Sequence, residues 1–493
     1  MSVTVNIVRA GVFLDSVVLM QISRELTAIQ GVEDAALMMA TPANWDILSD
    51  AGLLDEDTMA GPGDLLVAVR AQDRAIADST LQRAAELMER PAQQNNTSQE
   101  LRPLTLRSAC RQLPDANLAL ISVPGDFAGA EARKALRAGL NVMIFSDNVA
   151  LAEEISLKRE ARDLGLVVMG PDCGTAIIDG VPLAFANVVP RGDIAIVGAS
   201  GTGMQEVSCL IAHAGEGISH AIGVGGRDLT EAVGAISTLT VLDWLERDVA
   251  THHIVLIAKP PAPSVVDQIT DFIRSSSKSY TVCLVGSDDL ALPDNAKLTT
   301  TLKDAAAAAV TNSKELETLP AVQRAPVAGS YVRGLYSGGT LAAEAQVVFL
   351  SHGQPVLSNA PVPGARLFTS ERTNHIMIDL GDDRFTRGRP HPMIDPAVRD
   401  EPICAALSDP DVGVVLLDVV IGFGAHADPA GHLAGLLDRH GRSGSVVIAS
   451  VTGTDEDPQV RARQVSVLER AGVVVAPSNA DAAELALAGL KIG

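Results

Sequence analysis

The sequence predicts an α/β protein built from several parallel-sheet domains. Three observations support this prediction: short apolar runs alternate with helix-like segments, a Gly-rich turn joins such a run to a helix at 192–206, and the pattern around that turn recurs 138 residues later. At 493 residues the chain is too long for one ordinary core, and its 42 glycines suit many strand-to-helix turns. We therefore expect three large units, one of them composite.

The first part of the chain, residues 1–93, predicts a small α/β unit. The expected strands are 3–9, 34–40 and 64–70, and the expected helices are 15–30 and 74–90. The polar stretch 91–100 has no apolar periodicity and is typical of a linker.

A second unit begins with the β-α-β-α-β rhythm of a Rossmann-like parallel sheet over residues 101–190. Its expected strands are 118–123, 142–145 and 166–169, with helices after Gly125 and over 149–164. The rhythm resumes over 191–320, with strands expected at 194–197, 220–224, 253–257 and 281–285. These strands are short and apolar throughout, which is typical of strands buried on both faces.

The third unit, residues 329–493, repeats the opening of the 191–320 segment. Gly201-Thr-Gly-Met-Gln-Glu206 aligns with Gly339-Thr-Leu-Ala-Ala-Glu344 at an offset of 138 residues, and Gly215 aligns with Gly353 at the same offset. Duplication of a flavodoxin-like domain explains this match. Two such domains packed about a pseudo-twofold axis would bring helix N-termini from both copies toward one point.

Composition excludes several classes of function. The net charge of −22 repels nucleic acid and anionic membranes, so we expect neither as a partner. The sequence shows neither a long uncharged apolar run nor a signal-peptide pattern, and a cytoplasmic protein is expected. The five cysteines are scattered without any C-x-x-C pair, so we expect reduced thiols and no metal site.

The Gly-rich turn predicts an anion site. Five mostly apolar residues run into the turn and a helix-permissive segment follows, so a strand, a turn and a helix are expected. A helix N-terminus directs unpaired N–H groups and partial positive charge at one point, and glycines let a ligand approach the backbone. The expected phosphate-binding residues are Ser200, Gly201, Thr202 and Gly203.

Several segments in this order resemble a known family. The segments 123–128, 170–174, 200–206 and 223–229 resemble the α subunit of succinyl-CoA synthetase, in the particular form found in the FdrA family. Residues 330–493, including 416–429, resemble the CoA-ligase domain of the β subunit. The resemblance implies a CoA-binding-type domain over 101–190 and ligase-like domains of α type over 191–320 and of β type over 329–493.

In that family, helix N-termini from two ligase domains hold a phosphate carried on a histidine. The resemblance therefore implies a second phosphate-binding segment, which here comprises Gly422, Gly424, Ala425 and His426. It also implies a carboxylate beside the phosphate at Glu206, and we expect Glu206, Arg227 and His426 to be catalytic.

The sequence departs from the family in three places. The segment after Val282–Ser287 lacks the phosphorylated histidine, because no histidine occurs between His253 and His352. The chain has no room for an ATP-grasp domain, and the Gly-rich loop that holds CoA is replaced by residues 8–16. ATP use and a swinging phosphate therefore do not transfer from the family, and CoA binding stays open.

Resemblance to FdrA implies one subunit of an oxamate carbamoyltransferase that acts beside two other subunits in allantoin breakdown. That reaction moves a carbamoyl group between oxamate and phosphate, with carbamoyl phosphate as a product, and it needs no phosphohistidine and no resident cofactor. Two alternatives remain: a succinyl-CoA synthetase-like acyl-CoA ligase and a non-catalytic scaffold subunit that binds a metabolite. A homodimer is an alternative or additional assembly.

Further candidate residues each have a structural alternative. Arg227 and Asp228 follow a Gly-Gly turn and could hold a substrate carboxylate, or they could form a structural pair. Asp172 and Cys173 follow an expected strand and could line the same cleft, whereas His426 could simply cap a helix. The remaining candidates are three arginines in an otherwise acidic chain that would suit an anionic substrate or a solvated loop, namely Arg384, Arg387 and Arg389.

Overall fold

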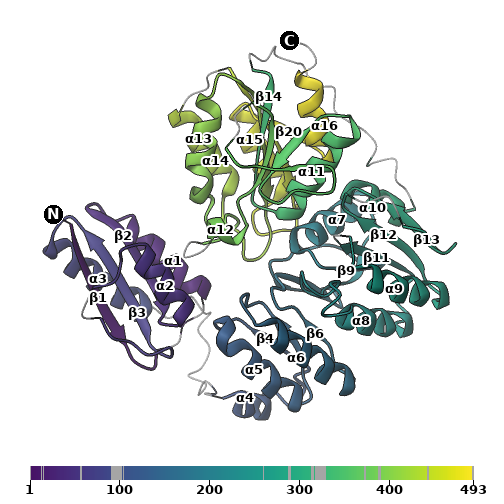
Figure 1. Cartoon of the computed structure of the whole chain (residues 1–493), viewed down its shortest axis with the longest axis horizontal. Coiled ribbons are helices and arrows are strands. Elements are labelled where there is room, and N and C mark those ends of the chain that lie inside the picture. The colour runs from purple at the N-terminus through teal and green to yellow at the C-terminus, as the bar shows by residue number, and fades with distance from the viewer. Residues whose placement is uncertain are drawn as a thin grey trace. The chain divides into compact units, whose positions relative to one another are not determined.

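A computed structural model describes residues 2–12, 14, 16–55, 58–89, 103, 105–258, 260–286, 290–311, 316, 329–370, 373–386, 390–440 and 444–490 (Figure 1). The chain divides into two compact units, residues 1–157 with 386–390 and residues 158–385 with 391–493. No helix in the described part of the chain combines the length and the hydropathy that a membrane-spanning segment needs.

The first unit opens with a three-stranded antiparallel sheet in the order β1-β3-β2. The elements are β1 (Val3–Arg9), α1 (Ser16–Thr27), β2 (Val32–Met39), α2 (Pro42–Asp50), β3 (Leu65–Ala71) and α3 (Arg74–Glu89). Val67 and Val69 on one face of the sheet pack with α1 and α3, whereas Leu66 and Ala68 on the other face pack with α2. The helix α2 was not among the expected elements, although Thr41 as N-cap and proline at the first helical position signal its start.

The remainder of the first unit follows the expected alternation. Its elements are α4 (Leu106–Gln112), β4 (Leu118–Ile121), α5 (Gly125–Arg137), β5 (Asn141–Ile144) and the first half of α6 (Leu151–Asp163). The strands β4 and β5 are parallel, as a β-α-β connection requires. Glycine is needed at 125, the first residue of α5, because a Cβ there would lie 2.7 Å from the backbone of Asn148.

In the second unit, the first of two large sheets has the strand order β13-β12-β11-β9-β10-β7-β8. After β6 (Val168–Met169) its elements are β7 (Thr175–Ile178), β8 (Val181–Ala184), β9 (Arg191–Gly198), α7 (Gly201–His213), β10 (Ile218–Gly223), α8 (Ile236–Arg247), β11 (His253–Ala258), α9 (Pro263–Ser275), β12 (Ser279–Leu284), β13 (Ala296–Thr299) and α10 (Leu302–Ala309). The strands β9 to β13 are parallel in flavodoxin-like order. In Figure 1, α7 and α10 lie on one side of this sheet and α8 and α9 on the other.

The hairpin of β7 and β8 extends this sheet and was not predicted. Its two-residue turn is Asp179-Gly180, and both residues have left-handed backbone, with φ of 52° and 81°. This Asp-Gly pair is a strong hairpin signal in a sequence. β7 joins β10 in antiparallel orientation, so the sheet is mixed and not purely parallel.

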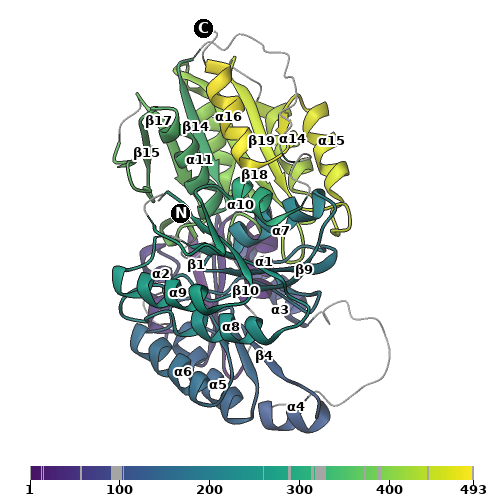
Figure 2. The ribbon, with the colours of Figure 1, turned by 90° about the vertical axis from the view of Figure 1, so that its right-hand side faces the viewer.

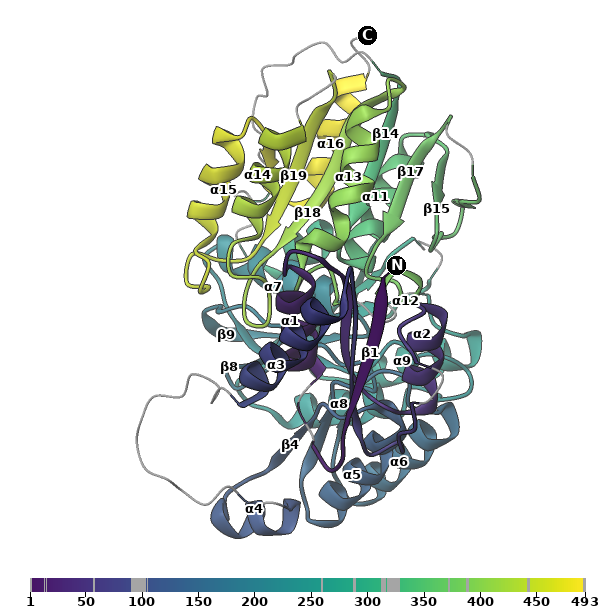
Figure 3. The same ribbon diagram turned by 90° about the vertical axis from the view of Figure 1, so that its left-hand side faces the viewer.

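The second large sheet is wholly parallel, with the order β16-β15-β17-β14-β18-β19-β20. Its elements are β14 (Tyr331–Tyr336), α11 (Gly339–Ser351), β15 (Val356–Ser358), β16 (Arg366–Leu367), β17 (His375–Asp379), α12 (Asp383–Thr386), the 3-10 helix η2 (Pro396–Arg399), α13 (Asp400–Ser408), β18 (Val412–Val420), α14 (Pro429–His440), β19 (Val446–Thr452), α15 (Arg461–Arg470), β20 (Val474–Ala476) and α16 (Asn479–Leu490). Figure 3 looks onto the face covered by α13 and α14, and α11 and α16 cover the opposite face.

The two sheets belong to duplicated flavodoxin-like domains. Both α7 and α11 begin with glycine and contain 13 residues, at an offset of 138. Gly215 and Gly353 follow the two helix ends with φ of 82° and 70°, as a left-handed C-terminal glycine should. We call β9 to α10 the first copy and β14 to α16 the second copy.

Four helices form the contact between the copies. α7 lies beside α10 and α11 beside α16, as Figure 2 shows, and α7 also contacts α11. Their buried side chains share one apolar core. Examples are Leu210 of α7, Leu302 of α10, Phe349 of α11 and Leu487 of α16. Packing the two helix pairs face to face brings the N-termini of α7 and α11 together.

Candidate functional site

The Gly-rich turn forms the predicted strand, turn and helix. Ser200 is the N-cap of α7, and its Oγ accepts a hydrogen bond of 3.1 Å from the N–H of Gly203. A Cβ at Gly201 would lie 2.9 Å from Thr175 Oγ1, so a larger residue would collide with β7. Among the described residues, the backbone N–H groups of Ser200, Gly201 and Thr202 have no hydrogen-bond acceptor. This end of α7 therefore presents unused donors.

The N-terminus of α11 lies opposite the N-terminus of α7. The hydroxyls of Ser200 and Thr340 form a hydrogen bond. Gly338 packs against Thr202, because a Cβ at 338 would lie 2.8 Å from Thr202 Oγ1. Ser200 and Gly338 are partners in the 138-residue repeat, and so are Thr202 and Thr340. The two contacts are therefore related by the pseudo-twofold axis. Thr340 was not among the expected site residues, although the repeat aligns it with Thr202.

The segment Gly422–His426 was expected to be the second phosphate-binding helix start, and the structure places it in a loop that ends before α14 begins at Pro429. Three of its five backbone N–H groups have acceptors in the protein: that of Gly422 binds Gln459 Oε1 at 3.0 Å, that of Phe423 binds the carbonyl of Ala186 at 2.9 Å and that of His426 binds the carbonyl of Met393 at 2.8 Å. Those of Gly424 and Ala425 have no acceptor among the described residues. Glycine is needed at 424 because a Cβ would lie 2.6 Å from the Phe185 ring. Ala425 belongs to the same loop, which packs on residues 185–187 of the described chain and precedes α14.

His426 has the contacts of a loop-capping residue. Its Nδ1 accepts a hydrogen bond of 3.1 Å from the N–H of Asp428, and its own N–H donates to the carbonyl of Met393 at 2.8 Å. Its ring packs edge-on against His432 at a centroid distance of 6.3 Å. This arrangement favours the helix-capping interpretation over a catalytic role.

Glu206 and its repeat partner Glu344 are both buried between the copies. Glu206 accepts hydrogen bonds from the Thr452 hydroxyl and from the N–H of Asn479 at 3.0 Å, at the start of α16 in the second copy. Glu344 accepts from the N–H groups of Leu302 and Lys303, at the start of α10 in the first copy. Each carboxyl group therefore caps the last helix of the opposite copy, which differs from the catalytic role expected for Glu206.

Burial raises the proton affinity of both glutamates. Desolvation raises the pKa of Glu206, and desolvation together with the negative charge of Glu206 raises the pKa of Glu344 to about 8. The Asn479 side chain donates to Glu344 Oε2 at 2.7 Å and its N–H binds Glu206, so one residue bridges the pair. Glu344 is thus mainly protonated at neutral pH.

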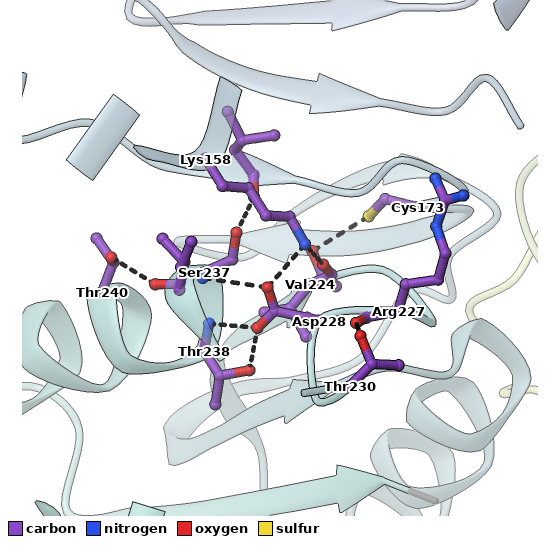
Figure 4. Close-up of polar contacts among 12 residues, drawn as sticks. Lys158, Cys173, Val224, Arg227, Asp228, Thr230, Ser237, Thr238 and Thr240 are labelled. Atoms are coloured by element: carbon purple, nitrogen blue, oxygen red, sulfur yellow. Dashed lines mark hydrogen bonds and ion pairs between the residues drawn. The ribbon is translucent and has the colours of Figure 1, made fainter. Parts of the chain in front are cut away.

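Asp228 is not a substrate-binding group, because a structural network uses both its oxygens (Figure 4). Oδ1 forms a fully buried ion pair of 2.7 Å with Lys158 Nζ, which also donates to the carbonyl of Val224 at 3.0 Å. The N–H groups of Ser237 and Thr238 and the Thr238 hydroxyl also bind Asp228 at the start of α8. The structural partner of Asp228 is therefore Lys158, which the sequence analysis did not single out.

Arg227 lies at the same turn and is half-buried. Its side chain extends away from the Lys158–Asp228 pair in Figure 4. Its carbonyl accepts the hydroxyl of Thr230 at 2.7 Å, which closes the turn. Arg227 thus follows the carboxyl end of β10, the edge of a parallel sheet where ligands commonly bind.

Asp172 and Cys173 follow β6 but differ in exposure. Asp172 is exposed with a φ of 57°, whereas the Cys173 thiol is buried within 3.5 Å of the carbonyls of Thr175 and Gly223. Burial raises the pKa of Cys173 to about 12, so the thiol is neutral. Cys173 is a packing residue, contrary to its assignment to the substrate site.

Of the three candidate arginines, only Arg384 lies within the described residues. It is exposed, forms an ion pair of 3.0 Å with Asp382 and donates to the carbonyl of Asn359 at 2.8 Å. These contacts indicate a local surface role. Arg387 and Arg389 lie outside the described residues.

Three family descriptions match parts of the chain. Residues 1–103 match "AllF, heavy metal-associated domain", residues 190–283 match "CoA binding domain" and residues 335–488 match "CoA-ligase". The last match agrees with the ligase-like domain expected at the C-terminus. The CoA-binding match falls on the first copy and not on 101–190, where the resemblance implied a CoA-binding-type domain.

The N-terminal domain does not fit a heavy-metal site, despite the description that it matches. Residues 1–103 contain no cysteine and no histidine, the side chains that heavy metals prefer. In the part of the chain that the structure describes, no group of His, Cys, Asp or Glu side chains is placed to hold an ion. We therefore assign no metal chemistry to this domain.

Similar solved structures add little. The dinucleotide-forming acetyl-coenzyme A synthetase 1 of Ca. Korarchaeum cryptofilum is 18% identical and covers 80% of this chain and 88% of its own. The TM-score is only 0.35, so this likeness supports no functional argument.

Sequence relatives are more informative. Succinate–CoA ligase [ADP-forming] subunit alpha 1 of Archaeoglobus fulgidus is 25% identical over 35% of this chain and 59% of its own length. The ADP-forming sulfoacetate-CoA ligase subunit SauD of Bilophila wadsworthia is 28% identical over 29% of this chain and 50% of its own. YahF of Escherichia coli (strain K12) is 40% identical over 97% of both chains. The chain belongs to the same family as YahF, a succinyl-CoA synthetase-like family with an AllF-type N-terminal domain and CoA-binding and CoA-ligase domains.

Proposed function

We propose that the chain is a subunit of an oxamate carbamoyltransferase-type enzyme and that it binds phosphate or carbamoyl phosphate at the N-terminus of α7. The observation that supports this most is the set of unused donors at Ser200, Gly201 and Thr202, beside the hydroxyl of Thr340. Such donors suit the oxygens of a phosphate and a developing oxyanion alike. The match of residues 1–103 to an AllF domain also supports this function class.

The proposed reaction is a direct transfer of the carbamoyl group to phosphate. A phosphate oxygen attacks the carbonyl carbon of a carbamoyl group that is bonded to the nitrogen of oxamate. The new oxygen–carbon bond forms, the carbon–nitrogen bond breaks, and the phosphate proton passes to the oxamate nitrogen. The donors at α7 hold the phosphate, and Arg227 orients the carboxylate of oxamate at the adjacent turn.

The absence of a histidine between His253 and His352 supports direct transfer over a phosphohistidine route. We further propose that no resident cofactor is required, that two other subunits complete the enzyme, and that the protein acts in the cytoplasm. A homodimer remains the alternative assembly. Neither nucleic acid nor membrane is a proposed partner, given the net charge of −22.

A second candidate is a CoA ligase of the succinyl-CoA synthetase type. The CoA-binding and CoA-ligase matches favour it, whereas the missing histidine opposes it. Calorimetric titration of the purified chain with phosphate, carbamoyl phosphate, oxamate and CoA separates the two. Binding of the phosphates without CoA supports carbamoyl transfer, and binding of CoA alone replaces it with the ligase function.

The site itself is tested by Ser200→Asp, which places a carboxylate among the proposed phosphate donors. We expect this variant to lose at least about tenfold in phosphate affinity and to lose phosphate protection against heat. Ser264→Asp is the matched control, since Ser264 is exposed in the first turn of α9 in the same copy. Equal phosphate protection of both variants would remove the α7 site from the proposal.

A third candidate, a metabolite-binding scaffold, predicts a different result. Alanine at Ser200 or Thr202 would then leave the activity of the assembled enzyme within severalfold of wild type.

A further inference from the structure

The equivalent turns of the two copies differ in what they hold. We call residues 199–202, between β9 and α7, the first cradle, and residues 337–340, between β14 and α11, the second cradle. In the second cradle the N–H groups of Ser337 and Gly338 and the hydroxyl of Ser337 all donate to the carboxylate of Asp418, each at 2.8 Å. Gly338 is the repeat partner of Ser200, so one of the donors that would hold a bound anion here already holds a carboxylate of the chain itself.

Asp418 is fully buried and its charge is balanced locally. Arg399 Nη1 forms an ion pair of 2.7 Å with Asp418 Oδ1 and also donates to the carbonyl of Asp418 at 2.9 Å. Both side chains are buried. A buried carboxylate with four strong donors is a fixed part of the second cradle. It occupies the N–H groups of Ser337 and Gly338, and its negative charge beside the turn disfavours another anion there.

The sheet register identifies the counterpart of Asp418 in the first copy. Leu335 of β14 lies opposite Leu417 of β18, and the repeat partner of Leu335, Val197 of β9, lies opposite Leu256 of β11. The residue that follows Leu417 is Asp418, and the residue that follows Leu256 is Ile257. An apolar side chain thus replaces the carboxylate in the first copy.

A second carboxylate of the second copy also has an uncharged counterpart in the first copy. Asp379 lies opposite Tyr336 at the end of β17 and packs against Gly339 in the second cradle. Its counterpart by register is Gly223, which lies opposite Gly198 in the first copy. The second cradle thus has two carboxylates and one guanidinium beside it, whereas the counterparts of both carboxylates in the first cradle are uncharged.

We propose that Asp418 is a built-in anion that closes the second cradle, so that the duplicated pair binds a single oxyanion, such as phosphate, at the first cradle. Asp418 thereby determines which of two equivalent turns takes ligand and fixes one orientation for the substrate. Oxyanion binding at the first cradle rests on the proposed function, whereas the role of Asp418 in the second cradle is tested independently of it.

The test is chemical rescue of Asp418→Ala in the full chain. Removing the carboxylate frees the Ser337 and Gly338 donors and the Arg399 charge, so formate or phosphate should enter and raise the Tm of the variant by several degrees more than that of wild type. Asp418→Asn keeps the shape of the side chain, so it should respond much less. Should Asp418→Ala be insoluble, its refolding yield from urea with and without formate gives the same comparison.

Equal responses of wild type and Asp418→Ala to formate and to phosphate would overturn the assignment of Asp418. The first cradle is tested separately with Ile257→Asp, which should lower phosphate affinity at least about tenfold, against Ile257→Asn as the uncharged control. If wild type binds no phosphate while Asp418→Ala is rescued, the proposed function fails and the role of Asp418 stands. If wild type binds two phosphates, a closed second cradle is refuted.

Discussion

Replacing Glu344 by glutamine should flatten the dependence of stability on pH. The pKa of Glu344 in the folded protein is about 8, against an ordinary value of 4.5, because the carboxyl group is buried beside Glu206. A folded-state pKa above the unfolded value means that stability is fully present below pH 4.5 and is lost as the pH rises through 8. At about 1.4 kcal/mol per pKa unit, this loss amounts to about 5 kcal/mol. Glutamine cannot titrate, so Glu344→Gln should lack this loss.

The assay is urea unfolding at pH steps from 5 to 8.5. The control is Glu401→Gln, which makes the same substitution at an exposed position of α13. The control should keep the wild-type slope of unfolding free energy against pH, whereas Glu344→Gln should lose most of it, whatever its absolute stability. Equal slopes for the two variants between pH 5 and 8 would refute the raised pKa of Glu344 and the buried carboxyl pair as a source of pH sensitivity.

Three further predictions concern buried groups of the second unit. Lys158→Met leaves a buried carboxylate without its 2.7 Å partner and should lower the unfolding free energy by about 3–5 kcal/mol in urea denaturation; a loss below about 1 kcal/mol would contradict the buried pair. Cys173, with a pKa of about 12, should resist iodoacetamide at pH 8 while the more exposed Cys110 is labelled, as mass spectrometry would show; equal labelling would disprove its burial. Gly338→Ala would place a Cβ 2.8 Å from a threonine oxygen on α7 and should lower the Tm, whereas Gly226→Ala enters open space and should not; similar Tm values would contradict the close approach of the two helices.

Local patterns predicted most of the secondary structure. The strand expected at 3–9 is β1 without change, and the helix expected at 149–164 is α6 at 151–163. Apolar runs and glycines act over a few residues, so the sequence records them directly. The hairpin at Asp179-Gly180 could also have been predicted, because its turn signal is equally local.

The site was predicted only in part, because its parts come from distant segments. The α7 turn was expected, and the 138-residue repeat contained the information that Thr340 lies at the equivalent turn. The family resemblance directed attention to His426 instead, whose N–H and Nδ1 both make hydrogen bonds within the protein. The pairing of Lys158 with Asp228 spans 70 residues and has no sequence signal at all.

The sequence by itself determined the α/β class, the duplication and the strand, turn and helix of 192–206, because each depends on local chemistry or on a repeat visible in the chain. Only the tertiary structure decided which helix N-terminus faces α7 and which carboxylates are helix caps. Those outcomes depend on sheet register and on packing between the copies. Register sets Asp418 in the second cradle and Ile257 beside the first, and burial between the copies gives Glu344 a proton that its sequence context alone would not assign.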